Sequence, residues 1–240
     1  MQTKYKVIIA LIIVAMAFCG LYYYFGIYLP NEEEKAEHER LVREYYEAKI
    51  ALYEQENERY SDYEVDVAFI GDSLTDGYDL EKYYPQYITA NRGIGGDTTF
   101  GLEERLAVSV YDLKPKVVVM LIGGNNLDTM FENYEDILVG LGENLPNTKI
   151  VLVSLTAMGK DWARKNNLAA FNNVKIKALA EKYGYSYVDL FTPLLDVDTN
   201  EIRSEYTNDG AHQTDLGYEV FTSEITTVIE KILNNGENAN

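Results

Sequence analysis

Four short polar clusters carry the residue types that acyl-transfer chemistry needs. They are residues 71–74 (GDSL), 91–98 (NRGIGGDT), 123–126 (GGNN) and 209–212 (DGAH). Ser73 is a candidate nucleophile and His212 a candidate base. A carboxylate three residues before a histidine, as in Asp209, can fix the imidazole tautomer and leave the other ring nitrogen free to take a proton. These residue types point to nucleophilic catalysis by a serine.

Each cluster also has an ordinary structural interpretation. Asp72 and Ser73 are residue types that cap helices, and lone Asp-x-x-His pairs are usually structural. Amides that follow a strand, as in residues 123–126, also suit a simple turn. The chain has only two histidines, however, and His38 lies in a charged stretch far ahead of the clusters. A serine nucleophile in the globular part therefore has only His212 as its imidazole base.

The glycines of residues 93–96 do not form a dinucleotide-binding loop. Their pattern does not fit G-x-G-x-x-G, and they follow the second predicted strand and not the first. Glycine does let a backbone N–H group approach a reacting oxygen closely. The two histidines exclude a histidine-rich metal site, and the single cysteine, Cys19, excludes an intrachain disulfide. We therefore expect no metal and no cofactor.

The elements that must position these clusters are strands and helices in alternation. Nearly continuous apolar runs predict strands over about residues 65–70, 88–92, 116–122, 149–156 and 185–190, with helices over about 98–110, 131–145, 164–183 and 214–233. This alternation predicts an α/β fold with a doubly wound parallel sheet. Because the carboxyl ends of parallel strands meet at one edge, the four clusters should converge there.

Taken as an ordered set, the four clusters resemble the sequence blocks of the SGNH, or GDSL-type, hydrolase superfamily. The resemblance covers essentially residues 65–233 and is closest to the branch that looks like platelet-activating-factor acetylhydrolase. It implies a flavodoxin-like three-layer α/β/α sandwich with a five-stranded parallel sheet. It also implies that Ser73 is the nucleophile, that His212 is the general base and then the acid, and that Asp209 orients the histidine.

The resemblance further implies an oxyanion hole. Its donors are the backbone N–H groups of Ser73 and Gly96 and the side-chain amide of Asn125. Gly96, directly before Asp97, matches the oxyanion position better than the glycine ahead of it. The family's common G-x-N-D block is here GGNN, so Asn126 stands where the family has an aspartate beside Asn125.

The function implied is that of a serine esterase acting through an acyl-enzyme on short-chain esters, such as acetyl esters, of a glycan, a lipid or a small molecule. Two alternatives stay open: an O-acyltransferase acting on a cell-wall or surface glycan, and a non-catalytic membrane-tethered binding module. Tyr78, Met158 and Trp162 are on predicted loops, either as pocket walls or as ordinary core and rim residues, and we favour the second interpretation.

Composition bounds the partners. The chain has 240 residues, 47% of them hydrophobic, which suits one domain with extensions. The net charge of -18 argues against nucleic acid as a partner, because binding to phosphate groups needs a basic face. The sequence does not determine the oligomeric state.

The amino-terminal segment, residues 1–30, predicts a membrane anchor. Residues 7–29 carry no charge, and at ~1.5 Å per residue they span roughly 35 Å, enough for a bilayer core of about 30 Å. Four tyrosines crowd the far end, as in an interfacial belt. A signal peptide cleaved after residue 17, or a lipid on Cys19 despite the bulky Phe18, is less favoured. We expect an uncleaved single span with the catalytic domain outside the cell.

Residues 31–64 predict a charged helical linker. They hold twelve acidic and five basic side chains. Leu41, Tyr45, Ala48 and Leu52 recur at helical spacing, so this stripe either packs on the domain or pairs with a second copy. The predicted hydrolase domain follows over residues 65–240.

Overall fold

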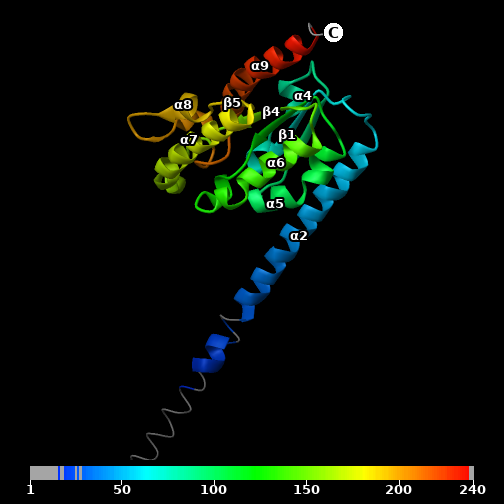
Figure 1. Cartoon of the computed structure of the whole chain (residues 1–240). Helices are drawn as coiled ribbons and strands as arrows, with labels where there is room; N and C mark the ends of the chain where they lie inside the picture. Colours follow the sequence, from blue (N-terminus) through cyan, green and yellow to red (C-terminus); the bar gives the residue numbers. More distant parts are fainter. Residues whose placement is uncertain (1–15, 17–18, 25, 27–28, 238–240) are drawn as a thin grey trace, which may run out of the picture. The chain divides into compact units, whose positions relative to one another are not determined.

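The computed structural model describes residues 16, 19–24, 26 and 29–237 (Figure 1). The chain divides into two units, Met1–Lys49 and Ile50–Asn240. Helix α2 (Leu29–Asn57) begins in the first unit and ends in the second. The compact second unit thus begins ahead of residue 65, where the sequence suggested that the domain starts. The assignment of residues 1–30, 31–64 and 65–240 to anchor, linker and hydrolase domain stays a prediction.

The five predicted parallel strands are confirmed. They form one sheet in the order β2-β1-β3-β4-β5, every neighbouring pair being parallel, which is the flavodoxin-like order. The central strands are fully buried, as their continuous apolar sequences require in a sheet covered on both faces. Their bounds are β1 Val67–Gly71, β2 Thr89–Gly93, β3 Val117–Leu121, β4 Lys149–Val153 and β5 Ser186–Val188.

Helices cover both faces of the sheet. Successive side chains of each strand point to opposite faces, so each strand contributes to two cores. Ala68 and Ile70 of β1 belong to a core that includes α5 (Thr99–Glu104), α6 (Tyr134–Asn144) and α7 (Asn166–Tyr183). Val67 and Phe69 belong to the opposite core, with α4 (Leu80–Tyr83), α8 (Phe191–Leu194) and α9 (Asp215–Glu237). The result is three layers (Figure 1).

The structure contains several short elements that the sequence did not predict. They are too brief for hydrophobic periodicity to show, since that signal needs a window of 11–18 residues. They are the four-residue helices α4 and α8 given above, α3 Ser73–Asp76, the π-helical turn η2 Ala107–Tyr111, the 3₁₀ turns η3 Gly124–Asn126, η4 Met130–Glu132, η5 Lys160–Lys165 and η6 Ser204–Tyr206, and the hairpin strands β6 Leu195–Asp196 and β7 Glu201–Ile202.

Two predicted elements are clearly shorter in the structure than the sequence suggested. The helix expected over residues 98–110 ends at Glu104, and the π-helical turn η2 follows it. The strand expected over residues 149–156 ends at Val153. The backbone N–H of Ser154 still donates to the carbonyl of Val188 at 2.9 Å, and the sheet pattern stops at Leu155, whose backbone groups bond to a side chain. The backbone N–H and C=O of Leu155 pair with the side-chain amide of Asn173, at 2.7 and 3.0 Å.

The last turns of α2 belong to the core of the second unit. Tyr53 is buried, and its hydroxyl donates to the backbone carbonyl of Gly93 at 2.6 Å. The Asn57 side-chain amide donates to the carbonyl of Val108 at 2.7 Å. The predicted linker helix is therefore present but ends as part of the folded unit.

Among the residues that the structure describes, no helix combines the length and apolar character needed to cross a membrane. Most of the predicted span over residues 7–29 lies outside the described residues.

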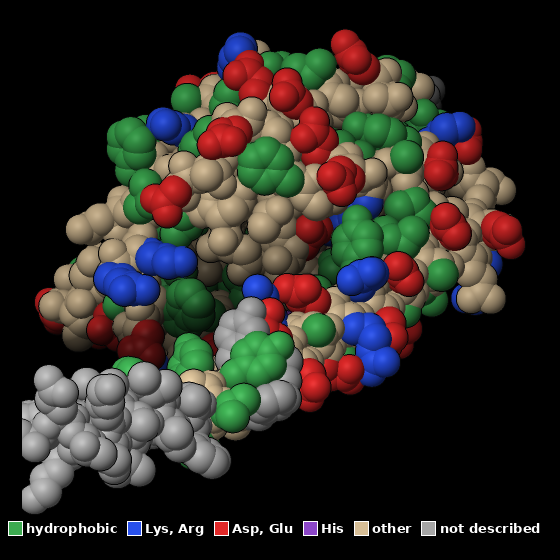
Figure 2. All heavy atoms as spheres, turned by 90° about the horizontal axis from the view of Figure 1, so that it is seen from below, with side chains coloured by type: hydrophobic (Ala, Val, Ile, Leu, Met, Phe, Trp, Pro, Cys, Tyr) green, Lys and Arg blue, Asp and Glu red, His purple; other side chains and the backbone are tan. Residues whose placement is uncertain are grey.

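Acidic side chains are spread over the face seen in Figure 2, with lysines and arginines singly or in small groups between them.

Candidate active site

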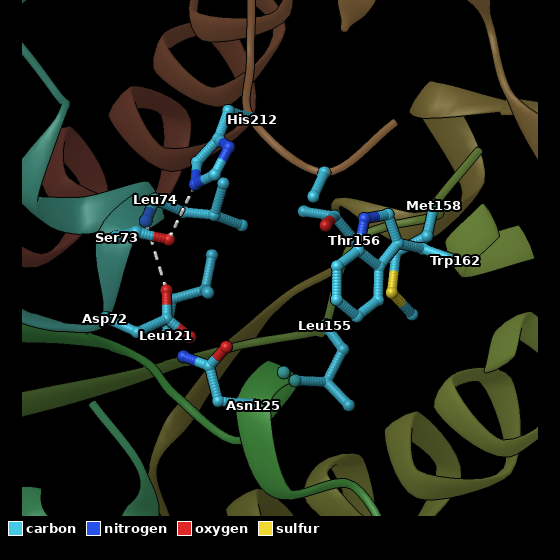
Figure 3. A pocket seen from close by; sticks show the side chains of 12 residues that line it. Asp72, Ser73, Leu74, Leu121, Asn125, Leu155, Thr156, Met158, Trp162 and His212 are labelled. Carbon is cyan, nitrogen blue, oxygen red and sulfur yellow. Dashed lines mark hydrogen bonds between the residues drawn. The ribbon is translucent and has the colours of Figure 1, made fainter. Parts of the chain in front are cut away.

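Ser73 lies at a sharp strand-to-helix turn. It is the first residue of α3, directly after β1 and the cap residue Asp72. One Asp72 carboxylate oxygen accepts a hydrogen bond from the backbone N–H of Leu74 at 3.1 Å. The capping interpretation is therefore correct for Asp72. It does not compete with chemistry at Ser73, whose side chain points into a cavity (Figure 3).

The turn before α9 brings His212 to Ser73. The His212 Nε2 atom lies 3.1 Å from Ser73 Oγ, across 139 residues of sequence. On its other side, His212 Nδ1 lies 2.7 Å from an Asp209 carboxylate oxygen. The second Asp209 oxygen accepts the backbone N–H groups of Ala211 and His212, at 2.9 and 2.8 Å. The three predicted residues thus form one continuous hydrogen-bonded array.

Glycine is required inside this turn. Gly210 has a φ of +100°, and a Cβ atom there would lie 2.4 Å from the backbone oxygen of Gly159. The Gly159 N–H donates to the Gly210 carbonyl at 2.7 Å. The close approach of two backbones therefore fixes the turn that carries Asp209 and His212.

The electrostatics of the pair favour one tautomer. Partial burial by itself raises the pKa of the Asp209 carboxyl, but hydrogen bonds from the His212 ring and from the His212 and Ala211 backbone outweigh it and hold that pKa well below its usual range. Asp209 is then an ionised acceptor near neutral pH, so His212 Nδ1 must carry the proton. Nε2 is left as the acceptor for the Ser73 hydroxyl.

The three predicted oxyanion donors come from three strand ends. The Ser73 N–H begins α3, Gly96 lies in the loop after β2 with a φ of +80°, and Asn125 lies in η3 after β3. Asn125 lines the same cavity as Ser73 and His212. Gly96 is exposed in the adjoining loop and is not among the cavity-lining residues. The Asn125 amide donates to the backbone carbonyl of Asp97 at 2.8 Å, which links these two loops.

Asn126 has a clear structural position. Its side-chain oxygen accepts the backbone N–H of Thr99 at 3.3 Å, and its amide donates to the Thr99 hydroxyl at 2.9 Å. An aspartate could accept from both groups of Thr99. The asparagine therefore preserves the link between η3 and the start of α5, and so keeps Asn125 in place.

The cavity beside Ser73 is mainly apolar and encloses about 120 Å³. Met158 and Trp162 both line it, and each also has the ordinary position that we favoured, because Met158 belongs to the buried core and Trp162 is an exposed residue at the rim. Tyr78 does not line it. That ring is buried against Tyr218, with its hydroxyl 2.6 Å from Thr222 Oγ1. The complete lining is Asp72, Ser73, Leu74, Leu121, Gly124, Asn125, Leu155, Thr156, Met158, Trp162, Ala211 and His212 (Figure 3).

Buried asparagines of α7 hold one cavity wall, and our sequence reasoning missed them. Asn173 pairs with both backbone groups of Leu155, and Asn166 does the same for Met158 at 2.8 and 2.7 Å. Their spacing gives a usable signal. Asn166 and Asn173 share a helical stripe with Ala169, a position that is also buried. Polar residues on an apolar stripe indicate buried hydrogen bonds.

Asp72 is a second carboxyl at the site with a displaced titration. Burial raises its pKa to about 6, against the lowering effect of the hydrogen bond from Leu74 and with a further rise from the charge of Asp97.

Among the described residues, no group of three or more His, Cys, Asp or Glu side chains is placed to hold a metal ion. The groups assembled here suit nucleophilic attack on a carbonyl carbon.

A family comparison agrees with this geometry. The model of the GDSL-like lipase/acylhydrolase family matches residues 69–220, a stretch that contains all four polar clusters. The chain belongs to this family. Our inference of a GDSL-type hydrolase is therefore confirmed, and the chain is an enzyme of the esterase and acylhydrolase class. Comparison with curated protein sequences gives no match.

Solved structures share the fold of this GDSL-type hydrolase. A protein from Streptococcus pneumonia, provisionally described as a platelet activating factor, is 24% identical with a TM-score of 0.74, over 82% of this chain and 99% of that one. A GDSL-like lipase from Bacteroides thetaiotaomicron is 25% identical with a TM-score of 0.68, over 76% and 97%. An acetyl xylan esterase variant from Geobacillus stearothermophilus is 21% identical with a TM-score of 0.57, over 70% and 95%.

Proposed function

We propose that this chain is a serine esterase that hydrolyses short-chain carboxylic esters through an acyl-enzyme formed on Ser73. The observation that carries the proposal is the hydrogen-bonded array of Ser73, His212 and Asp209, with contacts of 3.1 and 2.7 Å, beside an apolar cavity. A nucleophile, a base within reach and a group that orients the base are the elements of nucleophilic acyl transfer.

In the first step Ser73 Oγ attacks the ester carbonyl carbon. His212 Nε2 takes the hydroxyl proton as the new C–O bond forms, and the ionised Asp209 stabilises the imidazolium. The tetrahedral intermediate then collapses with cleavage of the bond to the alcohol oxygen. His212 gives its proton to that oxygen, so the alcohol leaves neutral and the acyl group stays on Ser73.

Three donors stabilise the negative charge on the former carbonyl oxygen. They are the N–H groups of Ser73 and Gly96 and the side-chain amide of Asn125, which lie in the segments that follow β1, β2 and β3. Donors held in place before reaction cost no reorganisation when the charge develops. In the second step His212 deprotonates a water molecule, which attacks the acyl carbon, and the acid is released with Ser73 restored.

The cavity supports a short acyl group. Its volume of about 120 Å³ is small beside the roughly 300–1,000 Å³ of pockets that hold drug-sized ligands. Leu121, Leu155 and Met158 on its walls favour an apolar group over a charged one. An acetyl ester of a glycan, a lipid or a small alcohol fits this volume. The similarity in fold to an acetyl xylan esterase is in keeping with an acetylated glycan.

The test is activity profiling of the full chain in detergent. We expect a fluorophosphonate to label Ser73 and acetyl and propionyl esters to turn over faster than octanoyl esters. Ser73→Ala should lose both labelling and turnover, and Ser223→Ala, at an exposed serine of α9, should keep both. A wild-type chain that is neither labelled nor active would favour a non-catalytic binding module.

The same residues could pass the acyl group to a sugar hydroxyl in place of water. Incubation with an acyl donor and a glycan acceptor separates the two reactions, because transfer yields an acylated glycan and hydrolysis yields free acid. We expect free acid. An acylated glycan as the main product would make the chain an O-acyltransferase.

We also propose, from the uncharged residues 7–29, that the enzyme is anchored in the cell membrane with its catalytic domain outside the cytoplasm. Protease shaving of intact cells tests the topology. The domain should be cut without lysis. A domain that is cut only after lysis would place it on the cytoplasmic side.

A further inference from the structure

Arg105 is a buried arginine at the end of α5, with 2% of its surface exposed. Its guanidinium donates four hydrogen bonds. Nε donates to the Asp97 carboxylate at 2.7 Å, and Nη2 to the backbone carbonyl of Gly71 at 2.9 Å. Nη1 donates to the carbonyl of Arg92 at 2.9 Å and to the hydroxyl of Ser109 at 2.8 Å. One side chain thus joins four separate positions.

Two of these acceptors lie at strand ends that carry oxyanion donors. Gly71 ends β1, two residues before Ser73. Arg92 is the next-to-last residue of β2, just ahead of the loop that holds Gly96. The Gly71 carbonyl also accepts the backbone N–H of Ile94 at 3.1 Å, so the two strand ends are linked directly as well.

The third acceptor connects Arg105 to the remaining donor. Asp97 follows Gly96, its carboxylate is held by Arg105, and its backbone carbonyl accepts the Asn125 amide at 2.8 Å. Gly101 permits the close packing, since a Cβ atom there would lie 2.0 Å from an Asp97 carboxylate oxygen. Arg105 therefore touches, directly or through Asp97, each segment that carries a proposed oxyanion donor.

The geometry requires a guanidinium. Its donors are fixed in one plane and diverge, so it can hold acceptors on several segments at set distances. A lysine ammonium is a compact charge on a flexible stem and could keep the ion pair with Asp97 while losing backbone carbonyls. The other hydrogen bonds of the guanidinium also make the buried ion pair with Asp97 favourable, because such a pair is stabilising only when its remaining donors are satisfied.

We propose that Arg105 is a positioning residue that sets the relative placement of the three oxyanion donors. The proposal rests on the proposed esterase function. Arg105 does not line the cavity, and it acts through Asp97 and the strand ends. Oxyanion contacts are strongest in the transition state, so misplacing the donors should lower kcat more than it raises KM.

The test is a double-mutant cycle between Arg105→Lys and Asn125→Ala, with kcat as the readout. We expect Arg105→Lys to lower kcat by about tenfold or more in the wild-type chain. In the Asn125→Ala background, whose oxyanion hole already lacks the donor that Asp97 holds, the same change should cost about threefold or less. A residue that merely stabilises the fold would reduce kcat by the same factor in both backgrounds.

Arg92→Lys is the matched control. Arg92 is also a buried arginine, but its guanidinium bonds to Glu56 and Asn57 and lies over the Tyr53 ring. Its substitution should lower the unfolding temperature, with any effect on kcat independent of Asn125. If Arg105→Lys does not fold, Asp97→Asn takes its place in the cycle. This change removes the carboxylate that Arg105 holds and keeps the backbone carbonyl of residue 97, which accepts the Asn125 amide.

The outcomes separate the two proposals. Coupling between position 105, or 97, and Asn125 supports the positioning role. Independent effects in an active wild-type enzyme, or an unchanged kcat with a lower unfolding temperature, overturn it. A wild-type chain that hydrolyses no ester and takes no fluorophosphonate on Ser73 overturns the esterase function itself.

Discussion

The Asn125 side-chain amide donates a hydrogen bond to the backbone carbonyl of Asp97 at 2.8 Å while it lines the cavity beside Ser73. A primary amide has two N–H groups. One therefore anchors the side chain to the loop after β2, and the other can serve the oxyanion. This double use fixes the donor's position before substrate binds, which is what electrostatic stabilisation of a transition state requires.

Asn125→Ala should therefore slow turnover without unfolding the chain. Loss of one oxyanion donor costs about 3–4 kcal/mol in the barrier, or 10²–10³ in kcat. Asn125 is exposed, so the unfolding temperature should barely change. Kinetics on an acetyl ester and a thermal melt check both. Asn147→Ala, at another exposed asparagine, is the control, and wild-type kcat in Asn125→Ala would remove this residue from the oxyanion hole.

Ser73→Ala and His212→Ala should each abolish nearly all activity, and the double variant should be little worse than either. Residues that act as a unit are not additive, because removing one disables the step in which the other takes part. Rates for the two single variants and the double variant on one ester check the prediction. Independent losses that multiply would show that His212 acts elsewhere than on the Ser73 hydroxyl.

Asp72→Asn should make stability less dependent on pH. Burial raises the pKa of Asp72 to about 6 in the folded chain, so the folded state holds its proton more tightly than the unfolded state. Stability from this group is then fully present below about pH 4 and is lost as pH rises through 6. The loss approaches about 3 kcal/mol, and Asn avoids it while still accepting from Leu74.

Urea unfolding of both proteins at pH 4 and pH 7.5 measures this effect. The variant should gain on the wild type as pH rises. A difference between the two proteins that stays constant over this range would show that Asp72 titrates near its ordinary value in the folded chain.

Tyr53→Phe should destabilise the second unit by about 1–3 kcal/mol, because the buried carbonyl of Gly93 loses its hydrogen bond. A chain that begins at Ser61 should be weaker still. It lacks Glu56 and Asn57, which pair with the buried Arg92, and an uncompensated buried charge costs about 3–5 kcal/mol. A chain that begins at Glu47 keeps these contacts and is the control. Equal melting temperatures for the two chains would show that α2 adds nothing to the fold.

Local sequence predicted the features that depend on residues close together along the chain. The apolar runs of β1 and β3 predicted buried parallel strands, because only a sheet covered on both faces accommodates them. The spacing of Asp209 and His212 within one turn predicted their pairing, which the structure has at 2.7 Å. Strand ends that meet at one edge predicted that Ser73 and His212 would lie close together.

The sequence did not predict contacts between residues whose types look ordinary where they stand. An arginine after a helix is usually a surface residue, yet Arg105 is buried with four hydrogen bonds. Tyr53 stands in a charged helix and still reaches the core. The chemistry of the site thus follows from short motifs, because each motif carries its own functional groups. The placement of those groups was decided only by tertiary structure, because the burial that makes Arg105 and Tyr53 effective depends on segments far away in the sequence.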